Sequence, residues 1–231
     1  MVLFCILLRE YEVSMLGKLV DKLSKNRSDR LPPPLVYLVI IMAFFEFSSS
    51  IGDLSVSWVP PIRGFLFAYG AFWNGLLSDE LIPNFGLQPY SMFITHVFLH
   101  GGFIHFVMNA VVLLSLGKII YLKTNHWSVV FLFIFSGVLG GLSFFLLSKN
   151  QGPMIGASGS VFGFLGLWQF WDFKRRLQAG YSLKPVFSTI LGLVIVNVIL
   201  AFMLDGGLAW EAHLGGFVAG VIFGVFGSRS V

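Results

Sequence analysis

The chain has 231 residues, of which 56% are hydrophobic and only 11% charged, and its mean hydropathy is +0.85. Soluble domains carry about 25% charged residues, so the composition excludes an ordinary soluble domain and indicates an all-α membrane protein. The net charge is +4, but the basic residues lie between apolar runs without interleaved base-stacking aromatic residues, which argues against nucleic acid as a partner.

Residues 1–31 are predicted to form a basic cytoplasmic tail, and residues 32–228 a single six-helix domain. The apolar run 1–8 is too short to span a bilayer and is followed by Arg9, so we do not expect a removable signal peptide. Cys5 is the only cysteine, which excludes an intramolecular disulfide and a cysteine-based metal cluster.

Six apolar runs approach the roughly 20 residues that a membrane-spanning helix needs. The first run follows Pro32 and Pro33, which suit the start of a helix. The last run is short, but its glycines and flanking residues favour a span over a soluble core helix. The predicted spans are 35–52, 103–121, 128–148, 158–173, 186–204 and 213–227.

The distribution of basic residues predicts that both termini are cytoplasmic. With six alternating spans, thirteen of the fifteen Lys and Arg residues then lie inside, leaving Arg63 and Lys149 outside. Basic residues are enriched in cytoplasmic loops, so the fourth and sixth spans are expected to begin at the outer face. The minimal six-span core without a transit-type leader favours a bacterial plasma membrane, with an organellar membrane left open.

The connection 53–102 between the first two spans is too long for a simple turn. It carries too much apolar surface for an ordinary water-facing loop, and we predict a helical hairpin embedded in the outer membrane interface. Its aromatic residues include Phe65, Phe67, Tyr69, Phe72 and Trp73.

Two polar residues on the second span, His105 and Asn109, are four positions apart and therefore share one helix face. Both side chains can donate hydrogen bonds to the same place. Such a pair also occurs where polar residues of one membrane helix bond to a neighbouring helix, and this alternative stays open at this point.

The fourth span begins at Ser158, after Gly156 and next to Gly159. The first amides of a helix have no partners within the helix, so an oxyanion formed beside Ser158 would be stabilised by them and by the helix dipole. Serine is also a common N-cap, and the short motif alone is weak evidence. Because residue 160 is serine, the sequence does not fit the G-x-S-x-G elbow of soluble hydrolases.

The sixth span begins at His213, with Gly216 and Gly220 following on the same helix face. Small residues at this spacing allow two membrane helices to approach closely, and the fourth span offers Gly159 and Gly163 as counterparts. If these glycine faces meet, the His213 ring lies beside the hydroxyl at the start of the fourth span. The histidine could otherwise be an interfacial anchor, but an anchor does not need the glycines.

A neutral His213 could then take the proton from Ser158 as a general base. Attack on a peptide carbonyl would create a negative oxygen, which His105, Asn109 and the Ser158 amide could stabilise. A catalytic dyad is favoured over a triad, since no carboxylate is obviously placed behind the imidazole. The carboxylates considered are Glu46, Asp172, Asp205 and Glu211.

Three stretches together resemble the rhomboid intramembrane serine proteases. They are THVFLHGGFIHFVMN at 95–109, GASG at 156–159 and AHLGGFVAG at 212–220, and the similarity extends in order over about residues 35–227. The resemblance implies a six-transmembrane-helix rhomboid-like bundle. It also implies Ser158 as nucleophile, His213 as general base, and His105 and Asn109 as oxyanion donors.

The resemblance also implies roles for two further residues. Phe162 matches the aromatic residue that packs against the catalytic imidazole in that family, and His100 matches a position usually regarded as structural. The chain departs from the family at 88–91, where Gln-Pro-Tyr-Ser stands in place of an outer-loop Trp-Arg pair. The fifth span, 187–204, corresponds to the segment discussed as a lateral gate.

The resemblance implies hydrolysis of membrane-anchored proteins in or near a transmembrane helix, in contact with the lipid bilayer and without a cofactor or metal. A non-catalytic rhomboid-like protein that binds membrane clients would share the fold, but such proteins tend to lack the nucleophile or base. A transporter is disfavoured because paired broken segments are absent from the sequence. Zinc and aspartic intramembrane proteases are disfavoured because their motifs are missing. The oligomeric state is not predicted.

Overall fold

The computed structural model describes residues 31–53, 61–203 and 207–227. Most of the predicted tail at 1–31, together with Asp205 and Arg229, lies outside the described residues. Within the described ranges the regular structure is helical, apart from one isolated β-bridge between Phe72 and Met154.

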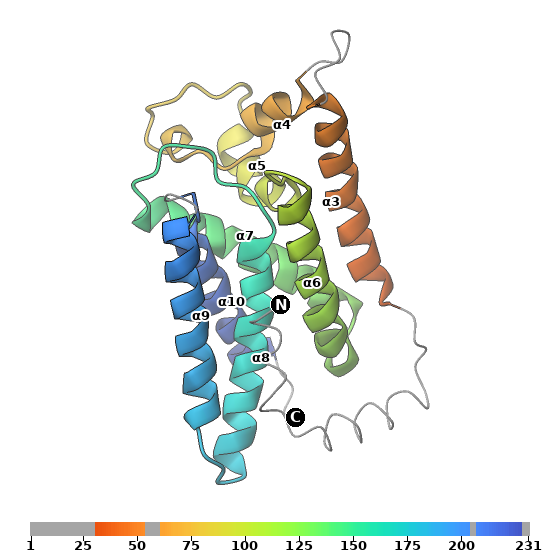
Figure 1. The fold of residues 1–231 in the computed structure, drawn as a ribbon, viewed down its shortest axis with the longest axis vertical. Helices are drawn as coiled ribbons and strands as arrows, with labels where there is room; N and C mark the ends of the chain where they lie inside the picture. The colour runs from red at the N-terminus through yellow and green to blue at the C-terminus, as the bar shows by residue number, and fades with distance from the viewer. Residues whose placement is uncertain (1–30, 54–60, 204–206, 228–231) are drawn as a thin grey trace. The chain divides into compact units, whose positions relative to one another are not determined.

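Each predicted span coincides with a helix in the structure (Figure 1). Five of them are long and apolar enough to cross a membrane, as a multi-pass membrane protein requires. These are α3 (Pro33–Gly52), α6 (Phe103–Lys123), α7 (His126–Leu147), α9 (Lys184–Met203) and α10 (Trp210–Gly227).

The remaining helix, α8 (Ser158–Gln178), has 21 residues but is not among these five candidates. Its last turns carry Asp172, Lys174, Arg175 and Arg176, so the helix continues past its apolar part. The predicted count of six membrane spans therefore stays a prediction.

The described chain forms two compact units. The larger contains residues 32–171 and the segment from 209 onward, and the smaller contains 172–208. In the smaller unit, Asp172 accepts hydrogen bonds from both Arg175 and Arg176 at 2.7 Å, which ties down the end of α8 before the turn into α9.

The core of the larger unit lies among α3, α6, α7 and α8. Its fully buried side chains include Leu35, Met42, Leu113, Phe133 and Phe164. These residues come from four different helices, so the burial of their apolar surface packs α3, α6, α7 and α8 against one another. Gly117 of α6 lies against Leu35, and a Cβ added there would overlap that side chain.

The long connection after α3 folds into α4 (Ile62–Gly70), η1 (Asn74–Leu76), α5 (Gln88–Thr95) and η2 (His96–Phe98). The helices α4 and α5 contact each other, and α4 also contacts α3 (Figure 1). Gln88 begins the stretch 88–91, where the sequence differs from the family pattern. Its side chain is buried and donates a 2.6 Å hydrogen bond from Nε2 to the Ala68 carbonyl. The stretch thus links α5 to α4, while its place in the membrane interface stays a prediction.

A second buried cluster joins this connection to the rest of the unit. Phe72, Met92, Phe144 and Met154 pack together, and Ala212 of α10 lies in the same cluster. The β-bridge adds two main-chain hydrogen bonds of 2.9 Å between Phe72 and Met154. Because Met154 is four residues before Ser158, the bridge fixes the path of the chain into α8.

Candidate active site

Ser158 is the first residue of α8 and is half-buried. The chain reaches it through Gly156, whose φ of +114° lies in the region that L side chains rarely adopt. The Gly156 amide donates a 3.0 Å hydrogen bond to the His96 carbonyl, which holds this turn against the segment before α6. The Ser158 side chain thus stands beside the unpaired amides at the positive end of a helix.

His213 lies in the first turn of α10 and is buried. Its Nε2 atom is 2.8 Å from the Ser158 Oγ atom, so the hydroxyl can donate to the ring nitrogen. The imidazole also stacks on Phe162, with ring centroids 4.2 Å apart and planes inclined by 5°. This stacking fixes the orientation of the imidazole toward the hydroxyl.

The first turns of α8 and α10 come close because glycines occupy both sides of their contact. A Cβ added at Gly216 would overlap the Gly159 carbonyl, and one added at Gly220 would overlap the Gly163 carbonyl. A Cβ at Gly166 would likewise meet the main chain of Phe217. We call this contact, made by Gly159, Gly163, Gly166, Gly216 and Gly220, the helix seam.

Of the predicted oxyanion donors, His105 lies two residues inside α6 and Asn109 one turn later. Both face Gly156: a Cβ built there would lie 2.8 Å from His105 Nε2 and 3.9 Å from Asn109 Nδ2. Asn109 Nδ2 also donates to the His105 carbonyl at 3.0 Å. The structure therefore brings His105, Asn109, Ser158 and His213 to one place from three helices.

Two of the four carboxylates that could have supported the His213 imidazole form ion pairs with arginines instead. Glu46 pairs with Arg63, and Asp172 is held by two arginines of its own helix. Glu211 is buried two positions before His213, and residues two apart on a helix do not face each other. Among the described residues, no group of three His, Cys, Asp or Glu side chains could hold a metal ion.

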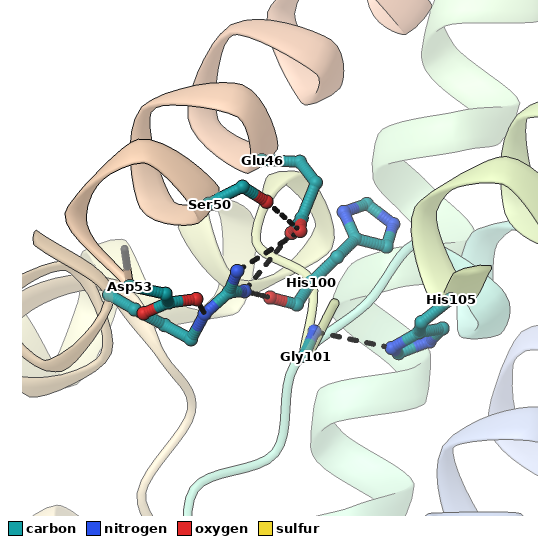
Figure 2. Close-up of polar contacts among 7 residues, drawn as sticks. Glu46, Ser50, Asp53, His100, Gly101 and His105 are labelled. Carbon is teal, nitrogen blue, oxygen red and sulfur yellow. Dashed lines mark hydrogen bonds and ion pairs between the residues drawn. The ribbon is translucent and has the colours of Figure 1, made fainter. Parts of the chain in front are cut away.

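Sequence reasoning missed a cluster of polar residues beside His105, and Figure 2 labels four of its members, Glu46, Ser50, Asp53 and His100. Arg63 of α4 binds Glu46 through Nη1 and Nη2 at 3.1 Å, and Asp53 through Nε at 2.6 Å. Ser50 donates to Glu46 at 3.0 Å. The hydrogen bond with Glu46 is the main cause that raises the pKa of Arg63. We call Glu46, Ser50, Asp53, Arg63 and His100 the arginine cluster.

His100 joins this cluster through its main chain. Its carbonyl oxygen accepts a 2.6 Å hydrogen bond from Arg63 Nη1 (Figure 2). Its buried ring lies against the rings of His105 and Phe106. Burial lowers the pKa of His100 to about 3, with smaller lowering by His105 and Arg63. A backbone hydrogen bond at Phe98 opposes part of this lowering, and the buried ring is held as a neutral, packed group.

One signal in the sequence could have revealed the cluster. Glu46 is the only acidic residue of its apolar span, and Arg63 is the only Lys or Arg between Arg30 and Lys118. A carboxylate in an apolar helix needs a cationic partner, and Arg63 is the nearest one along the chain after that span.

The comparisons with known proteins agree with the sequence resemblance. A family model described as the Rhomboid domain matches residues 88–230, which is more than half of the chain. Rhomboid-type serine protease 2 of Emericella nidulans is 30% identical over 163 residues, covering 68% of this chain and 30% of that protein. RHOMBOID-like protein 5 of Arabidopsis thaliana is 29% identical over 143 residues, covering 57% of this chain and 42% of that protein.

A bacterial relative gives a similar match. Rhomboid protease GluP of Bacillus subtilis is 24% identical over 155 residues, which are 64% of this chain and 29% of that protein. The chain thus spans less than half the length of each of these three relatives.

Proposed function

Because this chain belongs to the rhomboid family, we propose that it is an intramembrane serine endopeptidase that cleaves transmembrane segments of membrane-anchored proteins. The observation that carries the proposal is the 2.8 Å contact between Ser158 Oγ and His213 Nε2 at the start of the helix seam. A hydroxyl and an imidazole at this distance form a nucleophile and general base.

In the first step, His213 Nε2 takes the hydroxyl proton while Ser158 Oγ forms a bond to the substrate carbonyl carbon. The carbonyl π electrons move to the oxygen, giving a tetrahedral oxyanion. The donors available for it are His105 Nε2, Asn109 Nδ2 and the Ser158 amide. Loss of one such donor typically lowers the rate by about 100- to 1000-fold.

In the second step, the imidazolium returns the proton to the substrate nitrogen as the peptide C–N bond breaks. The amine product leaves, and an acyl group stays on Ser158. Water then attacks this ester with His213 again as base, which releases the acid product and restores the hydroxyl. The cycle uses one water per peptide bond and needs no cofactor.

The substrate must unwind locally, because an intact helix keeps its carbonyls in hydrogen bonds. Small or helix-breaking residues near the cleaved bond are therefore part of the proposal. So are six membrane spans, with α8 as one of them, and cytoplasmic termini in a bacterial plasma membrane. In this orientation Ser158 and His213 lie near the outer face.

The test is cleavage of a model transmembrane substrate by the purified protein in detergent or lipid. Wild type should cleave it, and Ser158→Ala and His213→Ala should each abolish cleavage. Ser115→Ala is the matched control, since this exposed α6 serine donates its hydrogen bond to the Val111 carbonyl of its own helix and should keep wild-type activity. Activity retained in either dyad variant would remove the proposal.

A serine-directed fluorophosphonate probe separates an enzyme from a protein that only binds clients. Wild type should be labelled at Ser158, and His213→Ala should be labelled much more slowly because the hydroxyl has lost its base. A binder with this fold would give no adduct.

A further inference from the structure

The peptide unit between His100 and Gly101 is hydrogen-bonded at both ends. Its carbonyl oxygen accepts from Arg63 Nη1 at 2.6 Å. Its N–H, on Gly101, donates to His105 Nδ1 at 3.4 Å (Figure 2). One peptide plane therefore connects the guanidinium of Arg63 to the ring of His105.

The bond to Nδ1 determines where the His105 ring carries its proton. A neutral imidazole has one donor nitrogen and one acceptor nitrogen. Since Nδ1 accepts from Gly101, the proton belongs on Nε2. Nε2 is also the ring nitrogen close to Gly156, on the side where Ser158 lies.

Arg63 is well suited to hold this peptide. The hydrogen bond from a guanidinium to a carbonyl is charge-assisted, and it polarises the peptide so that the N–H at the other end becomes a stronger donor. The guanidinium is itself held by two bonds to Glu46, whose side chain is fully buried. Asp53 binds a different guanidinium nitrogen, Nε, and its carboxylate is half-exposed.

We propose that Arg63, fixed by Glu46, is a positioning residue that keeps the proton of His105 on Nε2 by orienting the peptide between His100 and Gly101. The consequence for catalysis rests on the proposed function: only this tautomer presents His105 as an oxyanion donor. Arg63 itself touches neither substrate nor nucleophile.

The direct test is NMR of the full-length protein in micelles with ¹⁵N-labelled histidine. The His105 signals are assigned by their loss in His105→Gln. Wild type should show a protonated Nε2 and an unprotonated Nδ1. Arg63→Gln should shift part of the population to the Nδ1-protonated form, whereas Asp53→Asn should leave the wild-type pattern.

If Arg63→Gln does not fold, Arg63→Lys is measured instead. Lysine keeps a cation beside Glu46, but its single ammonium group cannot bond Glu46 and the His100 carbonyl in the fixed geometry of a guanidinium. This variant should give an intermediate population of the two tautomers. A wild-type tautomer in the folded Arg63 variant overturns the proposal. This measurement needs no proteolysis, so it is independent of whether the chain is a protease.

Kinetics give the second test through a double-mutant cycle. Arg63→Gln should lower kcat about 10-fold with little change in KM, because it weakens one of several oxyanion donors. In a His105→Gln background the side-chain amide always donates, so adding Arg63→Gln should cost less than about twofold. An equal loss in both backgrounds would mean that Arg63 acts only on the fold.

Discussion

The helix seam and the arginine cluster both position groups of the candidate site, but they are built from opposite kinds of residue. In the seam, Gly216 and Gly220 of α10 lie directly against main-chain carbonyls of α8. In the cluster, Arg63 reaches Glu46 and the His100 carbonyl through side-chain hydrogen bonds. The seam brings Ser158 to His213, and the cluster lies behind His105.

The two regions therefore tolerate different substitutions. Main-chain contact leaves no room for an added atom, so the seam is sensitive to volume. An ionic cluster keeps its geometry only while each charge has its partner, so it is sensitive to charge and to pH. Substitutions that change one property at a time can therefore separate the two regions.

The largest effect is expected from Gly216→Ala in the seam. The new methyl group would overlap the Gly159 carbonyl, so α10 must move away and carry His213 from Ser158. A displacement of about 1 Å at reacting groups can cost about 100-fold in rate, and we expect at least that loss of proteolysis.

The matched control is Gly192→Ala in α9, where a Cβ would meet nothing within 4 Å. This variant should keep full activity, measured by cleavage of the same substrate. Full activity in Gly216→Ala would show that the seam does not set the distance between the two groups.

In the arginine cluster, Arg63→Leu should lower the free energy of unfolding by about 3 kcal/mol, because it leaves the buried Glu46 carboxylate without its cation. The double variant Glu46→Leu/Arg63→Leu should regain most of this stability, since paired apolar residues can replace a buried ion pair. Denaturation in mixed micelles, followed by circular dichroism, measures both values.

Asp53→Asn is the control for the same cluster. Its carboxylate is half-exposed, so its loss should cost less than about 1 kcal/mol. The double leucine variant should stay impaired in proteolysis even when it is stable. Recovery of activity together with stability would contradict a positioning role for Arg63.

The free energy of unfolding of the protein should also depend on pH, through His100 of the arginine cluster. Its pKa is lowered to about 3 in the folded protein, so between pH 6.5 and 3 the unfolded chain binds a proton that the folded chain does not. Stability is therefore lost as the pH falls, by about 2 kcal/mol between pH 7 and pH 5. Between pH 7 and pH 5 the wild type should therefore lose about 2 kcal/mol more unfolding free energy than His100→Phe does. Equal losses in the two proteins would contradict the prediction.

The smallest effect is expected from Phe162→Leu in α8. The stacked pair with His213 is worth about 1 kcal/mol beyond its buried area, so kcat/KM should fall about 3- to 10-fold. Phe131→Leu is the control, because Phe131 also stacks on an aromatic ring, that of Phe135, but lies exposed on α7. Equal losses in both variants would show that the stacking on His213 has no special role.

The positions of the helices could be predicted from the sequence because apolar runs of sufficient length mark them directly. The family could be predicted as well, since three motifs carry it. The helix ends were less accurate: α8 continues to Gln178, five residues beyond its predicted end, because the charged residues after its apolar part are also good helix formers. The glycine spacing predicted the close approach of α8 and α10, which the structure contains.

The geometry of the arginine cluster could not be predicted from the sequence, which offers only the lone acidic residue of the first span and the nearest cation after it as a hint of the pair. Arg63 was counted only as one of two basic residues on the outer side, and Glu46 only as a carboxylate remote from the imidazole. Whether Arg63 meets Glu46 depends on how α4 folds back on α3. Hydropathy and motif spacing contain no information on that packing.

The bridge between Phe72 and Met154 uses only main-chain atoms. The bridge itself therefore makes no demand on side-chain chemistry, and substitutions at these two positions are limited by the buried cluster in which both side chains pack. Proline is excluded at either position for a separate reason, because it removes the N–H that the bridge donates.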